Sequence, residues 1–62
     1  MWLKYKVTAL KDTGVQLHPY NSDLKPEWIP FGYIKSIPNN VAIGDIVDVN
    51  ISDYFLEKLE WI

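Results

Sequence analysis

The strictest constraint in this chain is a regular alternation of apolar and polar side chains near its start. Between residues 2 and 10, one set of alternate positions is apolar and the intervening set is polar or cationic: Leu3, Tyr5, Val7 and Ala9 against Lys4, Lys6 and Thr8. A period of two places successive side chains on opposite faces of a strand. The pattern therefore predicts a half-buried β-strand.

A turn follows this strand. Asp12-Thr13-Gly14 has the composition of a three-residue hairpin loop, with Gly14 where a positive φ is favoured, and residues 15–18 resume the alternation. We therefore predict a β-hairpin whose loop is flanked by Lys11 and Val15. In that register Ala9 faces Leu17, Thr8 opposes His18 and Lys6 opposes Tyr20.

The middle of the chain is rich in proline and aromatic residues. The second strand is predicted to end near Tyr20, followed by an exposed loop over residues 20–26. Residues 27–33 are β-prone, but Pro30 cannot donate to a ladder and Gly32 favours a bulge, so we predict a short, kinked strand at a sheet edge. Its inward side chains would be Ile29, Phe31 and Tyr33, and residues 34–40 read as a connector.

The last twenty residues predict a turn, a strand and a helix. Ile43-Gly44-Asp45 is a tight turn into a strand over residues 46–51, with Val47, Val49 and Ile51 pointing inward. Ser52 is a candidate N-cap and Asp53 suits a first helical turn. A helix of about ten residues, marginal in isolation, would pack a stripe against the sheet: Phe55, Leu56, Leu59 and Ile62.

These elements predict one small, mainly β domain over residues 1–62 with a short C-terminal helix. The chain has 62 residues, of which 48% are hydrophobic, enough for one thin core. Closure hides the edges of so short a sheet, so we expect an SH3-like or OB-like barrel of four to five strands.

The charge pattern limits the class of partner. The chain carries six lysines, no arginine and eight acids, a net charge of −2. Arginine is the usual residue for bidentate contacts to guanine and phosphate, so its absence argues against sequence-specific DNA reading. Residues 1–35 hold a net +2 and residues 36–62 a net −4. The acidic half is most simply a solvated surface, and the alternatives are mimicry of nucleic-acid charge and docking on a basic patch.

Cysteine is absent, and no apolar run reaches the roughly 18 residues of a membrane span. The first residues also lack the long apolar stretch of a signal peptide. We therefore expect a cytoplasmic protein.

No constellation of residues predicts catalysis, a metal or a cofactor. Ser22, His18 and Asp23 could form a nucleophilic set only on paper, because no glycine-rich oxyanion turn accompanies them. One histidine and scattered acids give no metal-ligand spacing, and three separated glycines cannot build a phosphate cradle. We expect a non-enzymatic protein, with His18 an ordinary exposed strand residue.

Two groups of side chains are candidate binding sites. On the outer face of the hairpin, aromatics alternate with cations, a composition suited to stacking on bases and following a phosphate backbone; this set is Trp2, Lys4, Lys6, His18 and Tyr20. Lysines outside a strand are also the ordinary solvated choice. Trp28 and Pro30 on a sheet edge, and Trp61 near the chain end, could anchor a protein partner. A tryptophan beside a bulge more often caps the core, so burial is the favoured interpretation of Trp28, and Trp61 fits either core or an exposed tip.

Two stretches of the chain resemble a group of short phage and bacterial proteins of unassigned function. The stretches are Glu27-Trp28-Ile29-Pro30 and, after Gly44-Asp45, Ile51-Ser52-Asp53-Tyr54-Phe55-Leu56-Glu57-Lys58. In that group an aliphatic strand leads into Val-Trp-Ile-Pro-Lys-Ser, and a later strand ends in Ile-Pro-Glu-Trp-Leu-Ala-Glu-Lys-Lys. This chain departs at residues 31–32, where Phe-Gly replaces Lys-Ser, and at Ser52 and Tyr54, which replace Pro and Trp. The resemblance spans residues 5–60 in order and spacing. It implies a compact β-barrel with a C-terminal helix and a phage or mobile-element origin, and it transfers no active site.

The function predicted from the sequence is a non-enzymatic binding module that acts through protein contacts. A phage-encoded modulator or inhibitor of a host protein in the host cytoplasm is the form that the resemblance suggests. The alternative is a sequence-tolerant single-stranded nucleic-acid-binding barrel that uses the hairpin face. A third hypothesis is that the protein is a small accessory component of a larger assembly and is stable mainly as an oligomer.

Overall fold

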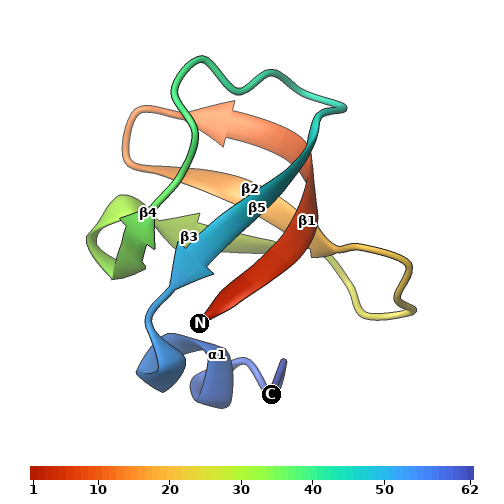
Figure 1. The fold of residues 1–62 in the computed structure, drawn as a ribbon, viewed down its shortest axis with the longest axis vertical. Coiled ribbons are helices and arrows are strands. Elements are labelled where there is room, and N and C mark those ends of the chain that lie inside the picture. Colours follow the sequence, from red (N-terminus) through yellow and green to blue (C-terminus); the bar gives the residue numbers. More distant parts are fainter.

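The computed structural model describes all residues from 1 to 62 and contains five strands and two short helices (Figure 1). The strands are β1 (Trp2–Lys11), β2 (Gly14–Pro19), β3 (Glu27–Pro30), β4 (Ile34–Ser36) and β5 (Ile46–Ile51). A 3₁₀ helix, η1 (Phe31–Tyr33), joins β3 to β4, and one α-helix, α1 (Asp53–Lys58), follows β5. No helix has the length and apolar character needed to cross a membrane.

The predicted β1–β2 hairpin is confirmed, but its register is wrong. Lys11 pairs with Gly14, so the loop holds two residues instead of three, and Ala9 lies opposite Gln16 instead of Leu17. A bulge at Thr8 then shifts the pairing again. The Thr8 hydroxyl lies 2.9 Å from the Gln16 side-chain oxygen and 3.2 Å from its carbonyl, donating across the bulge.

On the N-terminal side of the bulge in β1, the residue pairs differ from all those predicted. Val7 lies opposite Leu17, Lys6 opposite His18, and Tyr5 opposite Pro19. The inward residues predicted for β1 are confirmed up to Val7, but the bulge shifts the alternation by one residue, so Ala9, predicted to face inward, shares the outer face with Gln16. Tyr5 and Val7 are fully buried and Leu3 is half-buried.

Gly14 serves close packing and not the positive φ predicted for it. Gly44 is the one glycine with a positive φ, at 98°, in the predicted turn before β5. At Gly14 an added Cβ would lie 2.6 Å from the Ile29 carbonyl oxygen. Only glycine therefore permits the close approach of β2 and β3 at this position.

The strand predicted over residues 27–33 ends at Pro30, and the inward set proposed for this stretch is therefore wrong beyond Ile29. Ile29 is buried, but Phe31 and Tyr33 lie in η1, where the period of two no longer applies, and they are 42% and 38% exposed. Tyr33 instead stacks on Phe55, with ring centroids 4.5 Å apart. The supposed connector also contains β4, whose Ile34 pairs with Ile51 of β5.

All neighbouring strands are antiparallel and their order is β3-β2-β1-β5-β4, so β3 is an edge strand as predicted. In a flat sheet the edges would be about 19 Å apart, four spacings of about 4.8 Å. Yet η1 alone joins them, and a 3₁₀ segment advances about 2 Å per residue. The sheet must therefore curl, as Figure 1 shows, into the small barrel-like form that the sequence predicts. Whether that form is SH3-like or OB-like stays a prediction.

The curled sheet encloses one core, closed at one end by α1. Its buried members are Tyr5, Val7, Val15, Leu17, Ile29, Val49, Ile51, Phe55 and Leu56. Ser52 occupies the predicted N-cap position, but its carbonyl, not its side chain, accepts hydrogen bonds from the Phe55 and Leu56 amides. Beside it, Asp53 accepts a bond of 2.9 Å from the Met1 ammonium group, which lowers the pKa of its carboxyl.

The helix is shorter than predicted and its chain reverses direction. Glu60 adopts a φ of 61°, its amide donates to the Glu57 carbonyl, and the Trp61 amide donates to the Leu56 carbonyl at 2.9 Å. These two bonds form a Schellman motif, a helix ending in which glycine usually occupies the place of Glu60. The reversal leaves Ile62 exposed, against the prediction, and returns Trp61 toward β1.

Candidate binding pocket

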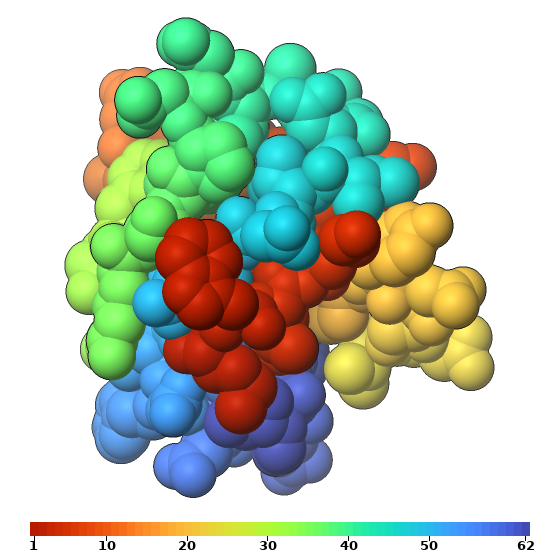
Figure 2. Space-filling model, viewed as in Figure 1, coloured from red at the N-terminus to blue at the C-terminus, as the bar shows by residue number.

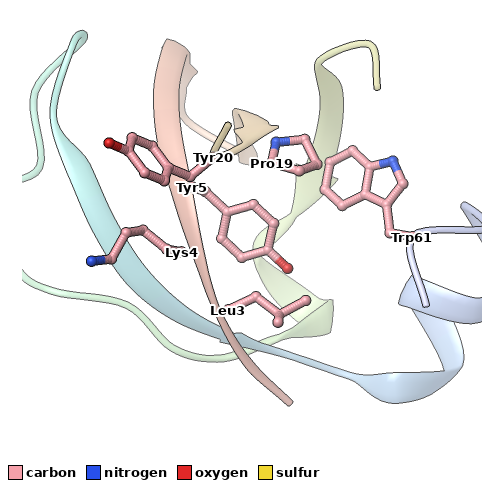
Figure 3. Close-up of a pocket in the computed structure, with 6 residues that line it drawn as sticks. All are labelled: Leu3, Lys4, Tyr5, Pro19, Tyr20 and Trp61. Carbon is pink, nitrogen blue, oxygen red and sulfur yellow. The ribbon is translucent and has the colours of Figure 1, made fainter. Parts of the chain in front are cut away.

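The structure contains one pocket, of about 220 Å³, beside the first residues of β1. Its walls come from β1, from the end of β2 and from the segment after α1: Leu3, Lys4, Tyr5, Pro19, Tyr20 and Trp61 (Figure 3). In Figure 2 the red N-terminal strand, the yellow loop over residues 20–26 and the dark blue chain end lie around this side of the molecule. The pocket thus joins three segments that are distant in the sequence.

Three consecutive residues of one strand line this pocket, which locates it at an edge of β1. Neighbouring side chains of a strand point to opposite faces, so Leu3, Lys4 and Tyr5 can share a cavity only along the strand's side. That side is open because β2 ends at Pro19. The last contact between the segments is a hydrogen bond of 3.0 Å from the Tyr20 amide to the Lys4 carbonyl, and Asn21, with a φ of 57°, follows it.

Tyr5 and Trp61 form the aromatic half of the pocket. Their ring centroids are 5.7 Å apart and tilted by 31°, a favourable arrangement for two rings. Figure 3 shows Leu3, Pro19 and these two rings on one side of β1, with the Tyr5 hydroxyl directed between Leu3 and Trp61.

The Tyr5 hydroxyl is buried and has no hydrogen-bond partner in the protein, the one buried side-chain polar atom in this state. Burial raises the pKa of this phenol to about 12, because the charged form is the more costly one to desolvate. An unpaired buried hydroxyl costs about 1 to 3 kcal/mol relative to a paired one. The fold therefore buries this polar atom beneath the pocket without a hydrogen-bond partner.

Lys4 and Tyr20 form the polar half. Their side chains extend to the other side of β1 in Figure 3, and the Lys4 ammonium lies 5.9 Å from the centroid of the Tyr20 ring. Both are exposed, and Lys4 forms no ion pair although Asp48 is its partner on β5. A cation without a partner thus stands beside an apolar recess.

The structure gathers the candidate nucleic-acid set on one side of the sheet. Trp2, Lys4 and Lys6 occupy the alternate, exposed positions of β1, and His18 lies opposite Lys6 on β2. The fifth member, Tyr20, contacts Lys4 instead of opposing Lys6 as predicted. On the neighbouring strand β5, however, Lys4 and Lys6 face Asp48 and Ile46, so the basic surface is narrow.

The candidate protein-binding set is divided between two places. Trp61 is in the pocket, whereas Trp28 and Pro30 lie on β3 and line no part of it. The favoured burial of Trp28 is wrong: its side chain is 38% exposed, because Ile29 takes the inward position of this strand. Lys11 covers the Trp28 ring with its ammonium 4.4 Å from the centroid.

Sequence reasoning missed three pocket residues. Leu3 and Tyr5 were assigned to the core by the alternation, correctly, and Pro19 to a strand end, but none was linked to a site. A tyrosine at an inward strand position in so small a core is the signal that could have identified the pocket, since its hydroxyl needs a partner. No group of three or more His, Asp or Glu side chains is placed to hold a metal ion.

Comparison of the chain with protein-family models, with curated proteins and with solved structures gives no match. The geometry of the pocket is therefore the basis of the functional argument.

Proposed function

We propose that this protein is a non-enzymatic binding module whose pocket receives an apolar group of a protein partner. One observation carries the proposal: the recess of Leu3, Tyr5, Pro19 and Trp61 combines aromatic walls with a buried hydroxyl that the fold leaves unpaired. Aromatic anchors and pockets supply most of the energy of protein interfaces.

The size of the pocket favours a protein partner over a small-molecule ligand. Sites for cofactors and drug-sized ligands occupy about 300 to 1,000 Å³, and this pocket has about 220 Å³. It suits one or two side chains of a larger partner. The mildly acidic net charge of −2 also favours protein contacts over a polyanion.

A peptide-display selection tests this function. The wild-type chain and two variants are each used to select from one random peptide library: Tyr20→Ala alters the pocket, and Tyr54→Ala, on an exposed helix position outside it, is the matched control. We expect the wild type and Tyr54→Ala to enrich a common motif and Tyr20→Ala to lose it. Absence of enrichment by the wild type, or equal enrichment by Tyr20→Ala, would contradict the proposal.

Single-stranded nucleic acid is the second candidate ligand, favoured by the contact between Lys4 and Tyr20 within the set of Trp2, Lys6 and His18. The test is an oligothymidine titration by tryptophan fluorescence at two salt concentrations. If this function is right, affinity falls with salt by a log-log slope of about −0.7 per phosphate neutralised. The double variant Lys4→Gln/Lys6→Gln must then weaken binding more than Lys25→Gln/Lys58→Gln, which changes the net charge equally. Equal effects of the two double variants would dismiss the hairpin face.

The resemblance of residues 27–30 and 51–58 to phage proteins supports one proposal about the partner: a host protein in the cytoplasm, modulated by a phage-encoded binder. The test is the identity of the genes that neighbour the gene for this protein. Phage structural or replication genes as neighbours would support the proposal, and a setting of chromosomal metabolic genes alone would contradict it.

A further inference from the structure

The pocket admits several kinds of protein segment, and its surroundings separate them. Strand addition needs a row of free backbone groups along an edge. Odd residues of β1 bond toward β5, as the bonds at the Met1 carbonyl and at both Val7 groups demonstrate, and the Lys4 carbonyl bonds toward β2. Only the Trp2 backbone groups and the Lys4 N–H therefore face the side that β2 has left. So short a row of free groups cannot hold an added strand.

A helix or a cationic side chain fits no better. A docked helix needs anchors one and two turns apart along a groove, and this recess of about 220 Å³ has room for only one or two side chains. Rings that surround a recess can also hold an ammonium group. Here the Lys4 ammonium already lies near the Tyr20 ring, and no acidic side chain lines the pocket, so a second cation would be repelled.

The hydrogen-bonding groups of the lining side chains indicate what the occupant contributes. Lys4 and Trp61 can only donate, Tyr5 and Tyr20 carry hydroxyls, and no carboxylate or amide side chain is present to accept. An occupant with free carbonyl oxygens and few N–H groups suits such a site, because a buried donor without an acceptor is costly. Proline has a carbonyl and no N–H.

From these observations, and resting on the proposed function, we propose that the pocket binds a proline-containing segment of the partner in the polyproline II conformation, with an acidic residue next to the prolines. Such segments have no internal hydrogen bonds and dock on aromatic-lined recesses. The prolines pack against Pro19, Tyr20 and Trp61, because Tyr5 lies fully buried beneath them. The acidic side chain meets Lys4, which has no ion-pair partner of its own.

The experiment uses the full chain labelled with ¹⁵N and the probe acetyl-Asp-Pro-Pro-Leu-Pro-Asp-amide, titrated by NMR. Two matched probes replace either the prolines by alanine or the two aspartates by asparagine. We expect the alanine probe to bind about tenfold more weakly, since each replaced proline removes contacts with the aromatic rings and part of the preorganisation of the segment. The asparagine probe should bind severalfold more weakly at low salt, and this difference should shrink at high salt as the Lys4 contact is screened.

Three results would overturn the inference. The first two are no binding of the proline probe and equal binding of the alanine probe. The third is displacement of the proline probe by trimethyl-lysine or oligothymidine at a concentration lower than that of the probe itself. The display selection separates this failure from failure of the proposed function. A motif without proline that still depends on Tyr20 leaves the binding module standing and dismisses the proline segment. The absence of any motif dismisses both.

Discussion

Two lysine-aromatic pairs lie on the surface of this barrel, and they differ in what surrounds them. At the edge strand β3, the Lys11 ammonium lies 4.4 Å from the Trp28 ring, and the pair faces solvent with no recess beneath it. At the pocket, the Lys4 ammonium lies 5.9 Å from the Tyr20 ring beside a recess that contains Tyr5 and Trp61. An exposed aromatic side chain is common on protein surfaces, whereas a recess offers the desolvated surroundings that binding energy requires.

The strongest test of this contrast removes one tryptophan from each place. Trp61→Ala should weaken binding of the proline probe about thirtyfold, the loss of about 2 kcal/mol expected of an interface anchor. Trp28→Ala should change the affinity less than about threefold, within the range of residues outside an interface core. Isothermal titration calorimetry measures both.

Circular dichroism must first establish that Trp61→Ala is folded, since Trp61 packs against Tyr5. Tyr20→Ala, which alters an exposed ring, repeats the test without that risk. A larger loss in Trp28→Ala than in either pocket variant would reverse the assignment of the two places.

A second prediction concerns the β3 side of the comparison. Gly14→Ala should lower the free energy of unfolding by about 2 kcal/mol, because the new Cβ meets the Ile29 carbonyl oxygen and forces β2 and β3 apart. Gly32→Ala is the control, since no atom lies within 4 Å of its added Cβ and its φ is not positive.

Urea unfolding measures the stability of both glycine variants. The folded fraction of Gly14→Ala should retain its affinity for the proline probe, because the pocket does not include β3. If Gly14→Ala is as stable as Gly32→Ala, the close approach of the two strands is wrong.

A third prediction concerns the unpaired hydroxyl. Tyr5→Phe should raise the free energy of unfolding by about 1 kcal/mol at neutral pH, because it removes a buried polar atom that has no partner. The pKa of Tyr5 is raised to about 12, so the folded state keeps a proton that the unfolded state releases near pH 10. Wild-type stability should therefore fall between pH 10 and 12 more steeply than that of Tyr5→Phe. A stability loss in Tyr5→Phe at neutral pH would mean that the hydroxyl has a structural partner.

The smallest expected effect concerns Asp53, the first residue of α1. The pKa of Asp53 is lowered from its ordinary value of 3.8, first by a hydrogen bond from the Met1 ammonium and then by its charge. A lowered pKa in the folded state adds stability above the ordinary value, and this stability is lost as the pH falls through the lowered one. Wild-type chain should thus melt slightly above Asp53→Asn at pH 6 and coincide with it in acid. An unchanged difference across that range would exclude titration of this carboxyl as the cause.

The fold could be predicted where one local rule acts alone. Alternation identified the inward residues of β1 up to Val7 and those of β5, and Pro30 pointed to an edge strand. Prediction from the apolar pattern failed where a single contact decides the geometry. The bulge in the hairpin depends on Thr8 donating across the strands to Gln16, and no pattern of apolar residues signals that bond.

The pocket was harder to predict because it depends on chain reversal and on the end of a strand. Trp61 reaches Tyr5 because Glu60 adopts a positive φ, at a position where glycine would have been a visible signal. Lys4 and Tyr20 were assigned to one candidate site and Trp61 to another. The structure places all three around one recess, because β2 stops at Pro19 and leaves the edge of β1 open.

The most direct test of the pocket as the binding site uses the three tryptophans as separate reporters. Trp2, Trp28 and Trp61 each give one indole N–H signal in a ¹H–¹⁵N spectrum, and single substitutions assign them. Titration with the peptide enriched in the display selection should move the Trp61 signal progressively while those of Trp2 and Trp28 stay in place. Movement of the Trp28 or Trp2 signal with Trp61 unmoved would contradict the account.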